Sequence, residues 1–173
     1  MVSGNAFSVK LTDTSYAAAD LITLNNMTSG TINVVANNAA PTITGTAADL
    51  AQVFAAKVTS GNGILDTSIG DAVVTLASTD TAVSAADLHV IADGTTGTKT
   101  ITNVIRITGL LSDVMGVYAK TASITGDGNE AITLTDATID ASVFKTLIPN
   151  GVATPTTGTI TLLGSAISGT YSD

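Results

Sequence analysis

An internal repeat constrains this chain more than any other feature of its sequence. Three segments share the pattern Ile, Thr or Ser, and Gly, followed after three further residues by an Asp. They are residues 43–50, 107–114 and 167–173, and they begin 64 and 60 positions apart. A period of this length is typical of stacked-repeat architectures, in which each unit buries its apolar face against its neighbours.

Two further patterns are interleaved with the first. Strand-like segments recur, each followed by a short helix-like run, and segments of the form Gly-Thr-Ile or its variants lie between them. The full unit is therefore about 60 residues, made of two half-units of about 30 that each read strand, turn, short helix and loop. The strand-like segments are residues 7–13, 73–77 and 131–136, the helix-like runs are 17–21, 84–88 and 140–144, and the Gly-Thr-Ile-like segments are 30–34, 99–103 and 158–162.

Hydrophobic periodicity assigns the faces of the strands. Apolar and polar residues alternate, which places Val9 and Leu11 inward and Lys10 outward. Asn103 breaks the apolar rule, so we expect either a backbone partner for its side chain or a local shift of register. The other inward pairs expected are Val74 with Leu76, Ile132 with Leu134, Ile32 with Val34, Ile101 with Asn103, and Ile160 with Leu162.

The repeated order of strand and helix predicts parallel strands. We expect one domain over residues 1–173, an α/β solenoid of about six half-repeats of roughly 30 residues with the last one incomplete. Its parallel strands would stack in coils, with short helices on one side. The alternative is a mostly-β right-handed parallel β-helix in which the helix-like runs are single turns. An exposed end coil favours self-association or contact with neighbouring repeats.

Acidic residues recur where the short helices are expected to begin. Thr46 before Asp49 and Ser84 before Asp87 resemble capping boxes. A residue that recurs in every copy is expected to have a structural role in the repeat. Here an Asp near a helix start would interact with the positive end of the helix dipole, which argues against a catalytic role. The recurring positions are Asp20, Asp49, Asp87, Asp113 and Asp173.

Charge and composition exclude several function classes. Fourteen acidic against six basic residues give a net charge of −8, which argues against binding to nucleic acid or docking on anionic membranes. The chain has no Cys, so it has neither disulfides nor thiolate metal sites. No segment approaches the ~20 apolar residues of a membrane span, which predicts no membrane insertion. The first seven residues lack the features of a secretory signal, so any export signal is expected outside this sequence.

One loop is a candidate metal site. Asp127, Asn129 and Glu130 lie between and beside the glycines at 126 and 128, and clustered oxygen ligands of this kind can hold calcium. The competing interpretation is a solvated turn, because Gly, Asn and Asp are also ordinary turn residues. Calcium is the one cofactor that the sequence suggests.

His89 and the threonines are weaker candidates. His89 is the single histidine, and no nucleophile or carboxylate stands at a recognisable motif spacing from it, so we expect a structural role. Outward strand positions form rows of Thr, as in Thr100 and Thr102 or Thr159 and Thr161. Such rows occur in ice-binding proteins, but Thr is also a natural solvent-side strand residue.

Residues 42–50 (Thr-Ile-Thr-Gly-Thr-Ala-Ala-Asp-Leu) and 130–136 (Glu-Ala-Ile-Thr-Leu-Thr-Asp) resemble repeats of very large bacterial cell-surface or secreted proteins, cyanobacterial ones especially. The resemblance covers nearly the whole chain and implies a structural, adhesive or surface-layer role outside the cell. The half-units are also distantly similar to leucine-rich repeats, although no Asn stands at a fixed place after each strand.

The leading expectation is therefore a non-enzymatic structural or adhesive segment of a larger extracellular or cell-surface protein, acting as a stiff spacer or a self-associating array. The first alternative is a calcium- or carbohydrate-binding module, with surface polysaccharide as a partner. The second is a polysaccharide-active β-helix enzyme, for which the off-pattern acids Asp66, Asp71 and Glu130 are the best candidates.

Overall fold

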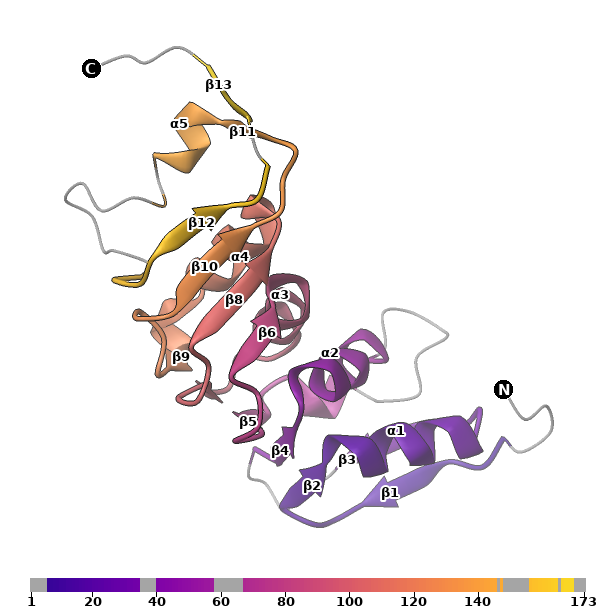
Figure 1. Ribbon diagram of the computed structural model, residues 1–173. Coiled ribbons are helices and arrows are strands. Elements are labelled where there is room, and N and C mark those ends of the chain that lie inside the picture. Colours follow the sequence, from indigo (N-terminus) through magenta and orange to yellow (C-terminus); the bar gives the residue numbers. More distant parts are fainter. Residues whose placement is uncertain are drawn as a thin grey trace.

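The protein is a mixed α/β structure of short parallel strands and short helices (Figure 1). The computed structural model describes residues 6–34, 40–57, 67–145, 147, 156–164 and 166–169. The strands are β1 (Val9–Leu11), β2 (Ser15–Ala17), β3 (Ile32–Val34), β4 (Thr42–Gly45), β5 (Val73–Leu76), β6 (Ala82–Ser84), β7 (Lys99–Thr100), β8 (Arg106–Gly109), β9 (Ile124–Thr125), β10 (Ala131–Leu134), β11 (Thr138–Asp140), β12 (Ile160–Leu162) and β13 (Ala166–Ser168). The helices are α1 (Ala18–Met27), α2 (Ala47–Ala55), α3 (Ala85–Gly94), α4 (Leu111–Tyr118) and α5 (Ala141–Phe144), with 3-10 turns η1 (Thr67–Ile69) and η2 (Thr121–Ser123).

Every strand pair in the described residues is parallel, which confirms the orientation predicted from the sequence. Four sheets run in the orders β2-β4-β5-β7-β9, β6-β8-β10-β12, β1-β3 and β11-β13, so strand order follows chain order in each. Paired residues lie from 23 positions apart, as Val9 and Ile32, to 31 apart, as Thr42 and Val73. The chain thus returns to the same sheet edge after each pass through a strand and a helix or loop.

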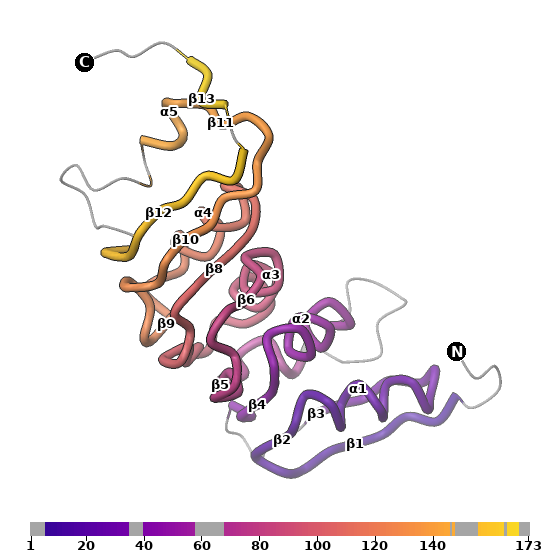
Figure 2. Tube along the Cα trace, in the orientation of Figure 1, coloured from indigo at the N-terminus to yellow at the C-terminus, as the bar shows by residue number. Residues whose placement is uncertain are grey.

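The pairing defines three repeat units. Unit 1 runs from β1 to α2, unit 2 from β5 to α4, and unit 3 from β10 to β13. In each unit the first strand pairs with the third and the second with the fourth. The fourth strand then pairs with the first strand of the following unit, as β4 with β5 and β8 with β10. Figure 2 shows the units following one another along the trace, with β1 and β13 at opposite ends.

One cluster of buried apolar residues runs through the three units. Most of the strand residues predicted to face inward are part of it, and Val74 and Ile132 are fully buried. Val9, Leu11, Ile160 and Leu162 are different, because they only pack against the cluster and stay half-buried. They lie in β1 and β12, each of which has a single partner strand among those described.

The predicted inward pair Ile101 and Asn103 was wrong in its second member. Lys99, not Ile101, takes the strand position of Ile32, because Lys99 pairs with Val74 as Ile32 pairs with Val9. The strand ends at Thr100, and the chain turns so that Asn103 is exposed while Val104 is buried. Of the two expectations for Asn103, the local shift of register is the correct one.

The helix starts follow the sequence prediction. Asp20, Asp49, Asp87 and Asp113 lie in the first turns of α1 to α4, and Asp173 lies outside the described residues. Thr46 Oγ1 accepts a hydrogen bond from Asp49 N at 3.1 Å, and Ser84 Oγ accepts one from Asp87 N at 3.4 Å. Both capping residues predicted from the sequence are confirmed.

A second acidic set caps helices across the units. The Asp80 carboxylate accepts from Ala47 N at 2.6 Å, and the Asp136 carboxylate accepts from Leu111 N at 2.8 Å. In each case the Asp follows the first strand of one unit and reaches the first residue of the last helix in the unit before. These carboxylates satisfy N–H groups that have no partner within the helix.

Glycine is required at the bend between β4 and α2 and at the bend between β8 and α4, which we call the glycine corners. A Cβ built on Gly45 would lie 2.7 Å from the Ala18 Cβ, and one built on Gly109 would lie 2.7 Å from the Ala85 Cβ. The recurrent Ile-Thr-Gly of the sequence therefore ends in Gly because its backbone packs directly on an alanine one helix earlier. No described helix is long and apolar enough to cross a membrane.

Candidate functional site

Each unit is closed by the same threonine–glycine contact, which we call the threonine clasp. Its threonine Oγ1 donates to a backbone carbonyl one strand away and accepts from the N–H two residues on. Thr95 donates to Ala72 O at 2.7 Å and accepts from Gly97 N at 2.9 Å. The other two clasps are Thr28, Gly30 and Phe7 O, and Thr156, Gly158 and Glu130 O.

The clasps define equivalent positions at Phe7, Ala72 and Glu130, which we call the seats. A Cβ on the clasp glycine would collide with the seat backbone in all three units, so the glycine is needed for this close approach. The clasp was missed in the sequence analysis. Its signal is the triplet Thr-x-Gly, which stands at 28–30, 95–97 and 156–158.

The unit 3 seat is the best candidate site because it breaks the repeat with a buried carboxyl group. Glu130 is 0% exposed. Its Oε2 accepts from the Tyr118 hydroxyl at 3.0 Å and from Gly128 N at 2.9 Å. Its Oε1 is buried and has no hydrogen-bond partner among the described residues. Buried carboxylates need such donors because burial disfavours their charged form.

The titration of the neighbouring groups reflects this burial. The pKa of Tyr118 is raised well above its usual value, first by burial and then by the charge of Glu130 and the hydrogen bond to it. The pKa of Asp127 is also raised, chiefly by burial, with repulsion from Glu130 adding to the effect. Tyr118 and Asp127 therefore each keep their proton to a higher pH than the same side chain does in water.

The predicted calcium ligands are spread over different environments. Asp127 is half-buried, Asn129 is exposed, and Glu130 points into the core. Gly126 and Gly128 adopt φ of +92° and +105°, so the loop bends in the left-handed region that favours glycine. Within the described ranges no group of three or more His, Cys, Asp or Glu is placed to hold a metal ion. Calcium binding by this loop stays a prediction.

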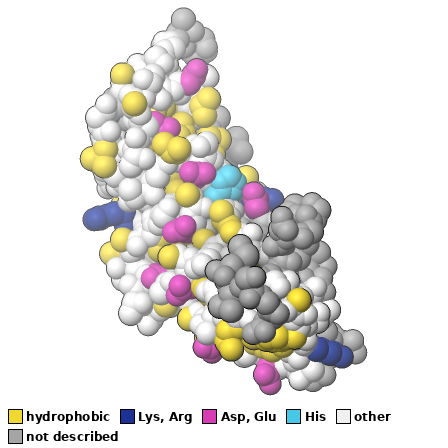
Figure 3. Space-filling view, turned by 90° about the vertical axis from the view of Figure 1, so that its right-hand side faces the viewer, with side chains coloured by type: hydrophobic (Ala, Val, Ile, Leu, Met, Phe, Trp, Pro, Cys, Tyr) yellow, Lys and Arg dark blue, Asp and Glu magenta, His cyan; other side chains and the backbone are white. Residues whose placement is uncertain are grey.

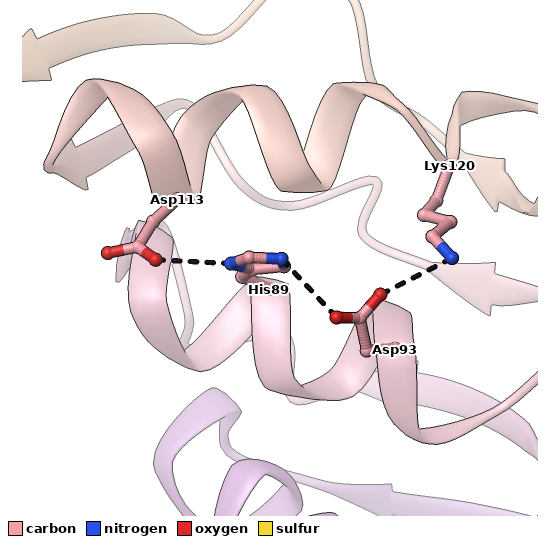
Figure 4. A network of polar contacts seen from close by, with 4 residues as sticks. All are labelled: His89, Asp93, Asp113 and Lys120. Atoms are coloured by element: carbon pink, nitrogen blue, oxygen red, sulfur yellow. Dashed lines mark hydrogen bonds and ion pairs between the residues drawn. The ribbon is translucent and has the colours of Figure 1, made fainter.

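A second polar network lies between α3 and α4 (Figure 4). His89 Nδ1 lies 3.1 Å from Asp113 Oδ1, and His89 Nε2 lies 3.4 Å from Asp93 Oδ2. Lys120 Nζ lies 3.3 Å from Asp93 Oδ1. A Cβ on Gly116 would collide with the imidazole, so glycine in α4 makes room for it.

This network joins two helices and leaves His89 little chemistry to perform. Both ring nitrogens face carboxylate oxygens, so neither is directed at a substrate. The predicted structural role of His89 agrees with this placement. Figure 3, turned to show the right-hand side of Figure 1, shows acidic side chains spread along this side of the molecule and not gathered into one patch.

The threonine rows are continuous across the strands. In one sheet Thr44, Thr75, Thr100 and Thr125 pair in register, and in the next Thr108, Thr133 and Thr161 do so after Ser84. Only some of these residues were expected as neighbours from the sequence. The rows lie on the side of each sheet opposite the buried Ile43 and Ile107 rows, which is where polar β-branched residues fit.

Asp71, one of the other acids proposed for catalysis, lies in a different environment from Glu130. Asp71 is exposed at the start of unit 2, whereas Glu130 is buried at the start of unit 3. Asp66 lies outside the described residues. Glu130 itself has no solvent access for a sugar, and glycoside hydrolysis needs two carboxyl groups flanking the bond.

Neither a protein-family model, nor a curated protein, nor a solved structure matches this chain.

Proposed function

We propose that this chain is a structural repeat segment, a solenoid of stacked coils that serves as a stiff spacer within a larger extracellular or cell-surface protein. The observation that carries the proposal is the repetition of contacts that join each coil to its neighbour, within a unit and between units. The clasp, the cross-unit Asp cap and the glycine corner each recur at equivalent positions. Nearly every distinctive residue is accounted for by joining neighbours.

The direction of the strands supports a spacer role. Each new strand is added to the same edge of a parallel sheet, so the structure lengthens along one axis as the chain proceeds. Repeat proteins of this kind gain stability from nearest-neighbour interfaces and can be lengthened by whole units. The low content of charged residues, 12%, and the net charge of −8 are compatible with a solvated acidic spacer.

Duplication of one unit tests the proposal. Ala72 and Glu130 are equivalent seats, so a second copy of residues 72–129 inserted before Glu130 keeps the clasp, the Asp cap and the glycine corner in every coil, while Tyr118 of the first copy meets Ala72 of the second. Since adjacent strands lie about 4.8 Å apart and one unit adds two coils, the longest dimension should rise by about 10 Å. Small-angle X-ray scattering measures this dimension, and thermal unfolding should show no loss of stability.

A matched control duplicates half a unit. A second copy of residues 72–96 adds one coil. The corner at Ala85 then packs on a second copy of itself, where a glycine such as Gly109 is needed. This variant should melt at a lower temperature than the whole-unit variant. If the two duplications behave alike, or if the whole-unit duplication adds no length, the stacked-spacer proposal is wrong.

A calcium-binding module is the second candidate, and one observation favours it. Glu130 Oε1 is buried and has no hydrogen-bond partner in the part of the chain that the structure describes, and the half-buried Asp127 is close by; such an oxygen can ligate a hard cation. Calcium that binds the folded state raises its melting temperature. A melting temperature that is unchanged between millimolar calcium and EDTA would exclude this candidate, and a rise that Asp127→Asn abolishes would support it.

A further inference from the structure

The two short sheets at the ends of the molecule correspond to the two halves of a longer sheet. Sheet β6-β8-β10-β12 begins with the second and fourth strands of unit 2 and ends with the first and third strands of unit 3. The β2-β4-β5-β7 part of the other long sheet has the same composition for units 1 and 2. Sheet β11-β13 is such a first half alone, and sheet β1-β3 is such a second half alone.

The two interior joints fix the register of the connection. At the first joint Ile43 pairs with Val74 and Thr44 with Thr75, and at the second joint Ile107 pairs with Ile132 and Thr108 with Thr133. Just beyond these pairs, Ala77 N donates to Gly45 O at 2.8 Å, and Thr135 N donates to Gly109 O at 3.0 Å. The residues equivalent to these in the end sheets are Ile167, Ser168 and Gly169 of unit 3, and Val9, Lys10 and Thr12 of unit 1.

The exposure of the end residues shows what such a joint would cover. Ile167 is 52% exposed, whereas its equivalents Ile43 and Ile107 are fully buried. At the other end, Phe7 is 45% exposed, whereas the seats of units 2 and 3 are fully buried. A hollow lined by Ser8, Val9, Lys10, Thr31 and Asn33 lies along β1 and β3.

We propose that copies of this chain join head to tail, with β13 of one copy pairing with β1 of the next in the register of the interior joints. Ile167 then pairs with Val9 of the second copy, and Ser168 pairs with Lys10. The four strands β11, β13, β1 and β3 complete a parallel sheet like β6-β8-β10-β12. This inference rests on the proposed stacked-spacer function and names its partner as a second copy of the same chain.

The joint cannot form within one copy, because β1 and β13 lie at opposite ends of the trace (Figure 2). The two surfaces are also different from each other, so the contact does not close on itself as a two-fold dimer would. Heterologous contacts of this kind produce open chains of copies. Association should therefore continue beyond the dimer as concentration rises.

Cysteine cross-linking tests the register. The chain has no Cys, so Ser168→Cys and Lys10→Cys variants each carry one thiol. Paired outward residues on adjacent strands lie close enough for a disulfide. Under copper–phenanthroline oxidation the mixture of the two variants should give a covalent dimer, and each variant alone should give little. A chain with both Thr108→Cys and Thr133→Cys is the internal control, because these residues already pair in the second joint.

The outcomes separate this inference from the function on which it rests. A mixture of Ser168→Cys with Thr12→Cys, two residues out of register, should cross-link far less. Homodimers of single variants in equal yield, or no dimer in the matched mixture while the internal control oxidises, would overturn the head-to-tail joint. If the unit duplication still lengthens the particle, the spacer function survives that failure.

Sedimentation of uncrosslinked protein gives a second measurement. Ile167→Glu places a charge in the joint, and the control Ile105→Glu places the same charge at an apolar residue that is 65% exposed between β7 and β8. Association of the Ile167 variant should weaken at least tenfold relative to the control at physiological salt. Equal association of both variants with the native chain would count against the joint.

Discussion

Units 2 and 3 place different chemistry at the same seat. In unit 2 the clasp closes on Ala72, and the matching position of the preceding helix is the buried Phe54. In unit 3 it closes on Glu130, and the matching helix position is Tyr118, whose hydroxyl donates to the carboxylate. Unit 3 thus has Tyr and Glu where unit 2 has Phe and Ala, and the threonine hydroxyl donates to the seat carbonyl in both units.

This difference shows that the threonine clasp is the feature common to the units, whereas the side chain at the seat is not. The seat is free to vary as long as the neighbouring helix supplies what the new side chain needs. A buried carboxyl group requires donors, and the phenol is one of the two that Glu130 has in the described residues. The two positions should therefore behave as a coupled pair in stability measurements.

The largest loss of stability is expected when a glutamate, the seat residue of unit 3, replaces the seat residue of unit 2 without a tyrosine on the neighbouring helix. Ala72→Glu buries a carboxylate at a seat whose matching helix position is Phe54, which has no hydroxyl, and should cost about 3–5 kcal/mol of unfolding free energy. Adding Phe54→Tyr should recover part of the loss. Urea unfolding of the single and double variants measures both, and a double variant no more stable than Ala72→Glu would contradict the pairing.

Removing the phenol from unit 3 should have the next largest effect. Tyr118→Phe leaves Glu130 Oε2 with the Gly128 N–H alone, which should cost about 1–3 kcal/mol. Tyr118→Phe combined with Glu130→Ala should cost less than the sum of the single changes, because the second change removes the group left without its donor. A double-mutant cycle by chemical unfolding measures the coupling, and additive losses would break the comparison.

The cross-unit caps should show no difference between the units. Asp80→Ala and Asp136→Ala each remove an acceptor from the first residue of a helix, and each should cost about 0.5–2 kcal/mol. Thermal unfolding of the two variants should give similar losses. A large disparity would mean that units 2 and 3 differ in more than their seats.

The smallest effect concerns Asp127, which is specific to unit 3. The pKa of Asp127 is raised in the folded protein above its ordinary value of 3.8, so the unfolded chain loses this proton at a lower pH than the folded protein does. Ionisation of Asp127 therefore lowers the free energy of unfolding as the pH rises above 3.8. Asp127→Asn removes that cost and should raise the melting temperature at pH 7. The gain should vanish below pH 3.8, and an equal gain at both pH values would show that the effect is not electrostatic.

The sequence predicted the fold better than the site because the two depend on different signals. Periodicity is local, so Val74, Ile132 and Leu134 could be assigned to the core, and Asp49 to a helix start, from their neighbours alone. The pairing of Tyr118 with Glu130 is not local. It depends on how α4 lies against the next strand, which spacing does not give. Lys99 shows the same limit, since its burial at an apolar strand position followed from pairing with Val74 and contradicted its charge.

Lys99 also shows how the strand accommodates that charge. Its Nζ donates to Ser123 Oγ at 2.8 Å. Burial, and to a lesser degree the charge of Lys120, lower the pKa of Lys99. A long side chain can bury its stem while its amine reaches a polar partner, and residue type alone does not reveal when a lysine does so.

The glycine corners constrain how genes for such chains can grow. Gly45 packs on Ala18 and Gly109 packs on Ala85, so corners that contain glycine and corners that contain alanine must alternate from one coil to the next. An in-frame gain or loss of a single coil would bring two corners of one kind together, whereas a gain or loss of two coils restores the alternation. Recombination between repeats is therefore expected to leave viable products in steps of about 60 codons, and the lengths of related arrays should differ by multiples of that step.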